Sequence, residues 1–253
     1  MIKNILKQSL AFFNLEVRRR SCYFIDDFLD QKKLLSKQEV TSIFDVGANI
    51  GQTSTKYREI FPNATIYAFE PTEEAFIKLH SKFKDCSHVK PFKAAVSSQS
   101  GHQPFFIYQS SLINSLLPVT TNADLYVLPP SHDFLETTYV QTTTIDIFCV
   151  QENIDKINIL KMDIQGGELI ALNGASNLLQ TKSIDLIYME VLFGEQYENQ
   201  ANFHDISKFL KDHKYILYGI YNLTRNSDGT LGYADAIFIS PNTQKNLNKL
   251  VRS

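Results

Sequence analysis

The chain has 253 residues, of which 43% are hydrophobic and 21% are charged. This composition is typical of a globular protein with a buried core, and it excludes a disordered chain. The formal net charge of −2 provides no strong positive field, so we expect no nucleic-acid partner. The length is sufficient for one large domain or two small ones.

The cysteines and the hydropathy of the chain predict a cytoplasmic protein. Cys22, Cys86 and Cys149 are widely spaced and odd in number, which excludes a disulfide framework and a short-spaced zinc site. No apolar run reaches the roughly 18–20 residues that a membrane span requires. Polar residues interrupt the first twenty positions, so these do not form the apolar stretch of a signal peptide.

Residues 1–40 are predicted to form an N-terminal helical segment, ahead of a main domain over 41–253. Apolar residues recur there at helical spacing, at Ile2, Ile5, Leu6, Leu10 and Phe13. Lys3, Lys7 and the arginines at 18–20 add positive charge. Two interpretations stay open: residues 1–20 contact a membrane surface or a partner, or the helix caps the main domain.

The main domain alternates strands and helices. The pattern predicts strands over 42–46, 65–70 and 89–96, and later over 157–163 and 184–191. It predicts helices over 53–61, 72–84 and 168–180, with Thr72 as the N-cap of the second. This order indicates an α/β fold with a mostly parallel, doubly wound sheet that has helices on both faces.

The remaining segments depart from simple alternation. Additional strands are expected over 102–109 and 139–145, on either side of a long polar stretch at 110–136. Such a stretch is either a binding loop or lid, or a disordered linker. After a helix over 202–213, two strands over 215–222 and 233–240 close the chain as an antiparallel pair.

A glycine-containing turn follows the first predicted strand, with the sequence DVGANIG at 45–51. Gly47 and Gly51 allow a tight turn and close approach of a ligand to the backbone. Dinucleotide-binding turns carry a further glycine where this chain has Asn49, which weakens that interpretation. The turn is equally suited to the amino-acid end of a nucleoside ligand, with Asp45 facing its ammonium group.

Two acidic residues end strands of the predicted sheet. Glu70 follows Gly51 by 19 residues, a spacing that suits hydrogen bonds to ribose hydroxyls. Asp163 ends the strand over 157–163 and precedes a pair of glycines and Glu168. Ligands bind at the carboxyl edge of such sheets, so a functional Asp163 is favoured, whereas Glu168 suits the positive end of the next helix.

Several motifs resemble class I S-adenosylmethionine-dependent methyltransferases, and more closely the FkbM family. They are DVGANIG at 45–51, YAFEP at 67–71, AAVSS at 94–98, TTTID at 142–146, LKMDIQGGELIALNGA at 160–175 and, more weakly, IYMEV at 187–191. The resemblance spans about residues 41–241. It implies a seven-stranded Rossmann-like fold, S-adenosylmethionine as cofactor, and O-methylation of a sugar, glycan or secondary-metabolite hydroxyl. Members usually carry a glutamate where this chain has Gln165.

The resemblance also implies site residues. Cofactor-binding positions are expected at Asp45, Gly47, Asn49, Gly51, Thr53, Glu70, Ala95 and Asp163. Because a hydroxyl is a weak nucleophile, a general base or a metal is needed. Asp163 is the first candidate for the base and Glu190 the second, ahead of His132 and His204. A divalent metal at the carboxylates is not established by their spacing.

The acceptor is expected to be a small molecule or a saccharide. Aromatic residues in the variable region either stack on it or form a local core; they are Phe105, Phe106, Tyr108, Tyr126 and Tyr139. Two other functions stay open. One is a non-catalytic interaction protein with the same fold. The other is an NAD-dependent oxidoreductase, which the missing third glycine disfavours.

Overall fold

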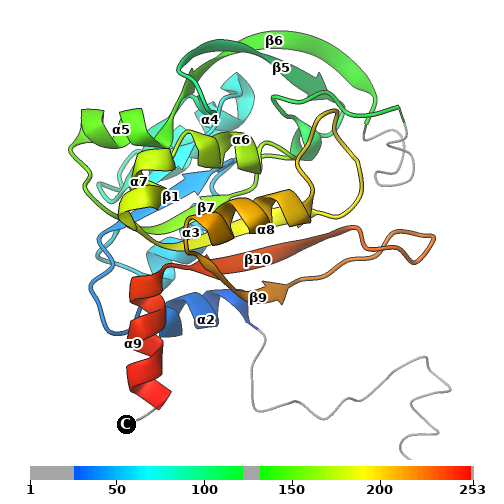
Figure 1. The fold of residues 1–253 in the computed structure, drawn as a ribbon. Helices are drawn as coiled ribbons and strands as arrows, with labels where there is room; N and C mark the ends of the chain where they lie inside the picture. Colours follow the sequence, from blue (N-terminus) through cyan, green and yellow to red (C-terminus); the bar gives the residue numbers. More distant parts are fainter. Residues whose placement is uncertain (1–25, 122–131, 252–253) are drawn as a thin grey trace, which may run out of the picture.

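A seven-stranded sheet forms the centre of the molecule (Figure 1). The computed structural model describes residues 26–121 and 132–251. The strand order is β3-β2-β1-β7-β8-β10-β9, and the first five strands are parallel. Their bounds are β1 Ser42–Val46, β2 Thr65–Phe69, β3 Val89–Phe92, β7 Ile157–Met162, β8 Ile184–Leu192, β9 Ile216–Tyr221 and β10 Tyr233–Ile239. β10 runs antiparallel to both β8 and β9, so the predicted α/β fold and its closing strand pair are confirmed.

Helices cover both faces of this sheet, because its central strands are apolar on both sides. One face packs against α2 Asp27–Leu34, α3 Gln52–Ile60, α4 Glu73–Phe83 and α9 Pro241–Val251. The other face packs against α5 Ile145–Glu152, α6 Glu168–Asn173, α7 Ser176–Thr181 and α8 Phe203–Asp212. In Figure 1 the helices α7 and α8 lie in front of the strands.

The helix predicted over 168–180 is two helices, α6 and α7, which meet at Gly174. A Cβ atom at Gly174 would lie 2.2 Å from the main-chain oxygen of Ser97. This close approach of two backbones requires glycine, and glycine weakens a helix interior. The prediction of one continuous helix was therefore wrong.

The strand predicted over 89–96 is also divided. β3 ends at Phe92, and β4 Ala95–Val96 belongs to a second sheet of order β4-β6-β5. The other strands of this sheet are β5 Gly101–Tyr108 and β6 Phe134–Thr143, which pair antiparallel and arch above the main sheet in Figure 1. β6 begins earlier than predicted, so the loop before it is shorter.

The first part of that loop folds back against the domain. A short 3-10 helix spans Ser111–Ile113, and Ser115 then pairs with Phe106 of β5. The Ser115 hydroxyl donates a hydrogen bond of 2.7 Å to the main-chain oxygen of Gln165. Residues 110–121 are therefore held against the carboxyl edge of the main sheet.

Residues 26–40 of the N-terminal segment pack onto the main domain. Leu34 and Leu35 belong to its core, and the Tyr221 hydroxyl donates to Asp30 at 2.8 Å. The contact predicted for residues 1–20 lies outside the described residues. Within the described ranges, the chain has no helix with the length and hydropathy of a membrane span.

Candidate active site

A cavity of about 440 Å³ opens at the carboxyl edge of the main sheet. This volume lies within the range of small-molecule sites. Its walls come from the ends of β1, β2, β7 and β8 and from residues 111–116. Of the cofactor-binding and catalytic residues predicted from sequence, those that line it are Gly47, Asn49, Thr53, Glu70, Ala95, Asp163 and Glu190.

The turn after β1 is shaped by contacts within the protein. Gly47 has φ +76°, and a Cβ atom there would lie 1.9 Å from the main-chain oxygen of Asp163. The amides of Gly47 and Ala48 donate to Phe69 at 3.1 and 2.9 Å, and the Asn49 amide donates to the Glu70 carboxylate at 3.0 Å. Because these three N–H groups already have acceptors, they do not offer the pyrophosphate cradle of a dinucleotide site.

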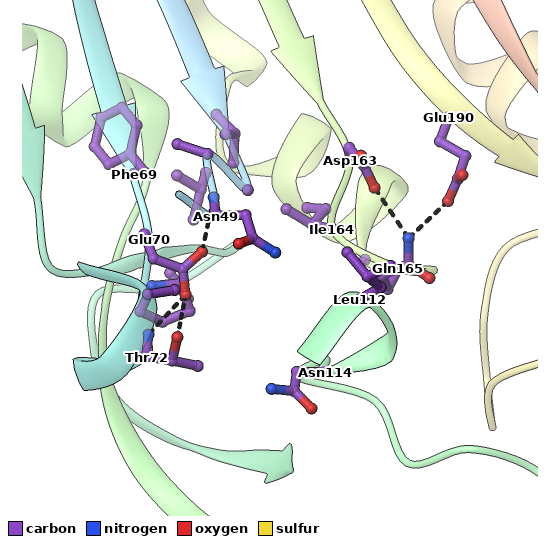
Figure 2. Close-up of a pocket in the computed structure, with 18 of the residues that line it drawn as sticks. Asn49, Phe69, Glu70, Thr72, Leu112, Asn114, Asp163, Ile164, Gln165 and Glu190 are labelled. Carbon is purple, nitrogen blue, oxygen red and sulfur yellow. Dashed lines mark hydrogen bonds between the residues drawn. The ribbon is translucent and has the colours of Figure 1, made fainter. Parts of the chain in front are cut away.

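Glu70 is fixed at one end of the cavity. Its side chain is only 7% exposed, and its Oε1 accepts hydrogen bonds from the Thr72 amide and hydroxyl at 2.9 and 2.5 Å (Figure 2). Burial raises the pKa of Glu70, while the hydrogen bonds from Thr72 and Asn49 act in the opposite direction. Thr72 does precede α4 as predicted, but its hydroxyl orients Glu70 and makes no cap to the helix backbone.

Asp45 and Gly51 have different surroundings from those predicted. Asp45 is fully buried; its carboxylate lies 3.0 Å from the Lys161 ammonium and accepts from the Ser54 hydroxyl at 2.6 Å. A ligand ammonium therefore has no access to it. A Cβ atom at Gly51 would lie 2.5 Å from the ring of Phe83 on α4. This glycine allows the start of α3 to pack closely against α4. A side chain at position 51 would point toward α4 and not into the cavity.

Lys161 is a site residue that the sequence analysis missed. It is 5% exposed, and its Nζ lies 3.0 Å from the Asp45 carboxylate and 4.0 Å from that of Asp163. It also donates to the main-chain oxygen of Gly47 at 3.0 Å. Burial opposes its charged form, but the carboxylates of Asp45 and Asp163 outweigh burial and raise the pKa of Lys161. The sequence did contain a sign of this role, because a lysine stands there between the apolar residues of a central strand.

A hydrogen-bonded cluster lies across the cavity from Glu70. The Gln165 amide nitrogen donates to Asp163 and to Glu190, in each case at 2.9 Å (Figure 2). The Tyr197 hydroxyl donates to the Gln165 amide oxygen at 2.9 Å, which fixes the orientation of the amide. Burial and the charges of Asp163 and Glu168 raise the pKa of Glu190 well above its usual range.

Glu168 supports the turn that carries this cluster. Its side chain is 3% exposed and accepts a hydrogen bond of 3.1 Å from the Ile164 amide. Burial raises the pKa of Glu168 to about 7. It is the first residue of α6, where its charge also suits the helix dipole.

The remaining candidates take no direct part in this cavity. His132 and His204 are not among its lining residues, and His204 is exposed on α8. Of the aromatic candidates, Phe105 lines the cavity, Tyr139 is 71% exposed on β6, and Tyr126 lies outside the described residues. In the described ranges, no three carboxylate, histidine or cysteine side chains are grouped to hold a metal ion. The Gln165 amide instead lies between the two carboxylates.

The family model of the FkbM methyltransferase domain matches residues 45–217. This range includes the ends of β1, β2, β7 and β8 and residues 111–116, which form the walls of the cavity. The chain belongs to the FkbM methyltransferase family. The prediction from the motifs is thereby confirmed, and the oxidoreductase alternative is wrong.

Two curated relatives resemble this FkbM methyltransferase at low identity. The hexuronic acid methyltransferase AglP of Haloferax volcanii is 27% identical over 202 residues, covering 77% of this chain and 71% of AglP. The 2-O-methyltransferase NoeI of Sinorhizobium fredii is 24% identical over 166 residues, covering 62% of this chain and 66% of NoeI. A structure of Aeropyrum pernix fibrillarin with S-adenosyl-L-methionine covers 83% of this chain and 74% of its own, at 12% identity and a TM-score of 0.45.

Proposed function

We propose that this FkbM methyltransferase transfers a methyl group from S-adenosylmethionine to a hydroxyl group of a sugar. The observation that carries the proposal is the arrangement of one cavity, with Glu70 at one end and the Asp163–Gln165–Glu190 cluster at the other. The names of AglP and NoeI support a saccharide acceptor.

The residues of the Glu70 end fit a nucleoside cofactor without phosphates. Glu70 offers carboxylate oxygens to ribose hydroxyls, while the neighbouring turn amides are already paired within the protein. Thr53 and Ala95 line the same space and add small side chains that leave room for a ligand. Asp45 and Gly51 act indirectly. Asp45 holds Lys161 in place, and Gly51 allows α4 to pack against the turn.

The opposite end provides the base. S-adenosylmethionine supplies an electrophilic methyl group on a sulfonium sulfur. Glu190 accepts the proton of the acceptor hydroxyl, because its raised pKa makes its carboxylate a stronger base than an ordinary one. Asp163, whose side chain is 46% exposed, accepts a hydrogen bond from a neighbouring hydroxyl of the sugar and so directs the reacting hydroxyl oxygen toward the methyl group. The proposal therefore takes Glu190 as the base, whereas the sequence favoured Asp163.

The cofactor part of the proposal is tested with Glu70→Ala. Loss of the charged acceptor should weaken binding of S-adenosylmethionine by about 1–3 kcal/mol, as measured by calorimetry. Glu74→Ala removes an exposed glutamate from the adjacent helix and is the matched control, with no expected effect. Equal affinities for the two variants would contradict the assignment of Glu70.

The transfer reaction is tested by incubating the wild-type chain with radioactive S-adenosylmethionine and a panel of mono- and oligosaccharides. We expect a labelled methyl ether to form on at least one of them. Binding of the cofactor without label on any saccharide would refute sugar methylation and favour the non-catalytic alternative.

A further inference from the structure

A second cavity, of about 300 Å³, adjoins the first at the carboxyl edge of the sheet. The two cavities share four lining residues, Thr53, Lys161, Asp163 and Glu190. A molecule in the second cavity can therefore reach the carboxylates to which we assign the acceptor hydroxyl. Of the residues that line only this second cavity, Met162 and Tyr188 lie in family motifs and the other five do not.

Those residues come from elements that are distant in the sequence but adjacent in the fold. They are Asp27 and Phe28 of α2, Lys56 of α3, Met162 of β7, Tyr188 of β8, Asp235 of β10, and Asn222 just after β9. Figure 1 shows α2 beside β9 and β10, which brings these side chains to one place. The second cavity thus depends on the N-terminal helix packing against the last strands.

Hydrogen bonds preorganise the polar wall of the second cavity. The Asn222 amide nitrogen donates to Asp235 at 2.7 Å and to Asp27 at 3.3 Å, and the Tyr188 hydroxyl also donates to Asp27. Asp235 lies directly opposite Glu190 in the β8–β10 pair, so this wall continues to the base. Phe28 and Tyr188, whose rings pack edge to face, add apolar surface beside these polar groups.

The charged side chains around the second cavity determine which kind of saccharide it can bind. Four carboxylates surround the second cavity, those of Asp27, Asp163, Glu190 and Asp235. The cavity is also lined by two lysines, Lys161, which is paired with Asp45, and Lys56, which keeps its charge over the Phe28 ring at 4.7 Å, so the carboxylates outnumber the lysines four to two. Hydroxyl groups can donate to these carboxylates, whereas an additional carboxylate would be repelled.

We propose that the second cavity is the acceptor site and that it takes the hydroxyl-rich end of an uncharged sugar rather than a uronic acid. The proposal rests on the methyl-transfer function argued above. It distinguishes this chain from AglP, which is named for a hexuronic acid.

The test uses three matched pairs of probes with S-adenosylhomocysteine bound to the full chain. The probes are the methyl glycosides of glucose, galactose and mannose and the same glycosides with a carboxylate at carbon 6. Saturation-transfer NMR measures their binding. We expect at least one neutral glycoside to bind about tenfold more tightly than its carboxylate counterpart, since tenfold corresponds to only about 1.4 kcal/mol of repulsion.

Two variants locate the effect. Asp235→Asn should reduce the preference for the neutral probe several-fold, because one repelling charge is removed while the shape is kept. Asn222→Gly should weaken binding of the neutral probe; its φ of +49° suits glycine, so the backbone is not strained. Asn153→Gly, at φ +55° on the exposed end of α5, is the matched control and should have no effect.

The outcomes separate this proposal from the function on which it rests. Failure to bind S-adenosylhomocysteine would refute the methyl-transfer function itself. With that ligand bound, the acceptor site alone is overturned if no neutral glycoside binds, if a carboxylate counterpart binds as tightly, or if Asn222→Gly behaves like Asn153→Gly.

Discussion

The Gln165 amide is the part of the site whose replacement has the clearest consequence. Gln165→Glu keeps the size of the side chain but places a third carboxylate 2.9 Å from an oxygen of Asp163 and of Glu190. At an effective dielectric constant of about 20, each contact would cost about 6 kcal/mol if nothing moved. Even a quarter of this energy would raise the pKa of a carboxyl group in the cluster by about one unit.

The cluster would relieve this repulsion by binding a proton. The three carboxylates would share this proton, so Glu190 would be protonated in part of the molecules at neutral pH and would be fully charged only as the pH rises. We expect the kcat of Gln165→Glu to fall at least tenfold at pH 7 and to recover partly by pH 9, while the affinity for S-adenosylmethionine stays close to that of the wild type. The acidic limb of the pH–rate profile should therefore move upward by at least one unit.

The pH–rate profile, measured with a fixed acceptor, is the deciding assay. Gln103→Glu, which makes the same change on β5, is the matched control and should leave the profile unchanged. A Gln165→Glu enzyme with reduced activity but an unshifted profile would refute the argument, because loss of shape alone would then explain the defect.

Two further changes test the structural basis of the site. Gly51→Val should destabilise the fold by about 2–5 kcal/mol in urea unfolding, since its side chain would overlap α4 at a φ of +83°; an undiminished stability with lost cofactor binding would contradict this. Burial raises the pKa of Glu168 from 4.5 to about 7, so the folded state retains a proton that the unfolded chain releases. The free energy of unfolding should therefore decrease by about 3 kcal/mol as the pH rises from 4.5 to 7. Glu168→Gln should abolish this dependence of stability on pH.

The parts of the site that follow single strands were predictable from the sequence. Glu70 and Asp163 each come directly after a parallel strand, and parallel strands of one sheet end at the same edge. Their prediction at one edge needed only that both strands belong to one parallel sheet. Periodicity and turn residues indicated such a sheet, because the central strands are short, apolar and separated by helices.

Contacts between distant segments were not predictable in this way. Gln165 acquires its role from Glu190 and Tyr197, which lie 25 and 32 positions further along the chain. The pattern of a single strand or turn carries no information about such partners. The same holds for Gly51, whose conformation was predictable but whose neighbour on α4 was not.

The glycine turn and Asp163, the carboxylate that orients the acceptor beside Glu190, are mechanically one unit, although they belong to different motifs. Gly47 touches the main chain of Asp163, and Lys161 joins the Gly47 carbonyl to the buried Asp45 carboxylate. Any change that separates the ends of β1 and β7 must therefore move the cofactor side and the base side of the cavity together. Methyl transfer needs the donor carbon and the acceptor oxygen in line, and a displacement of about 1 Å costs roughly 100-fold in rate. The buried ion pair, which adds little to stability by itself, is thus explained by the alignment that it maintains.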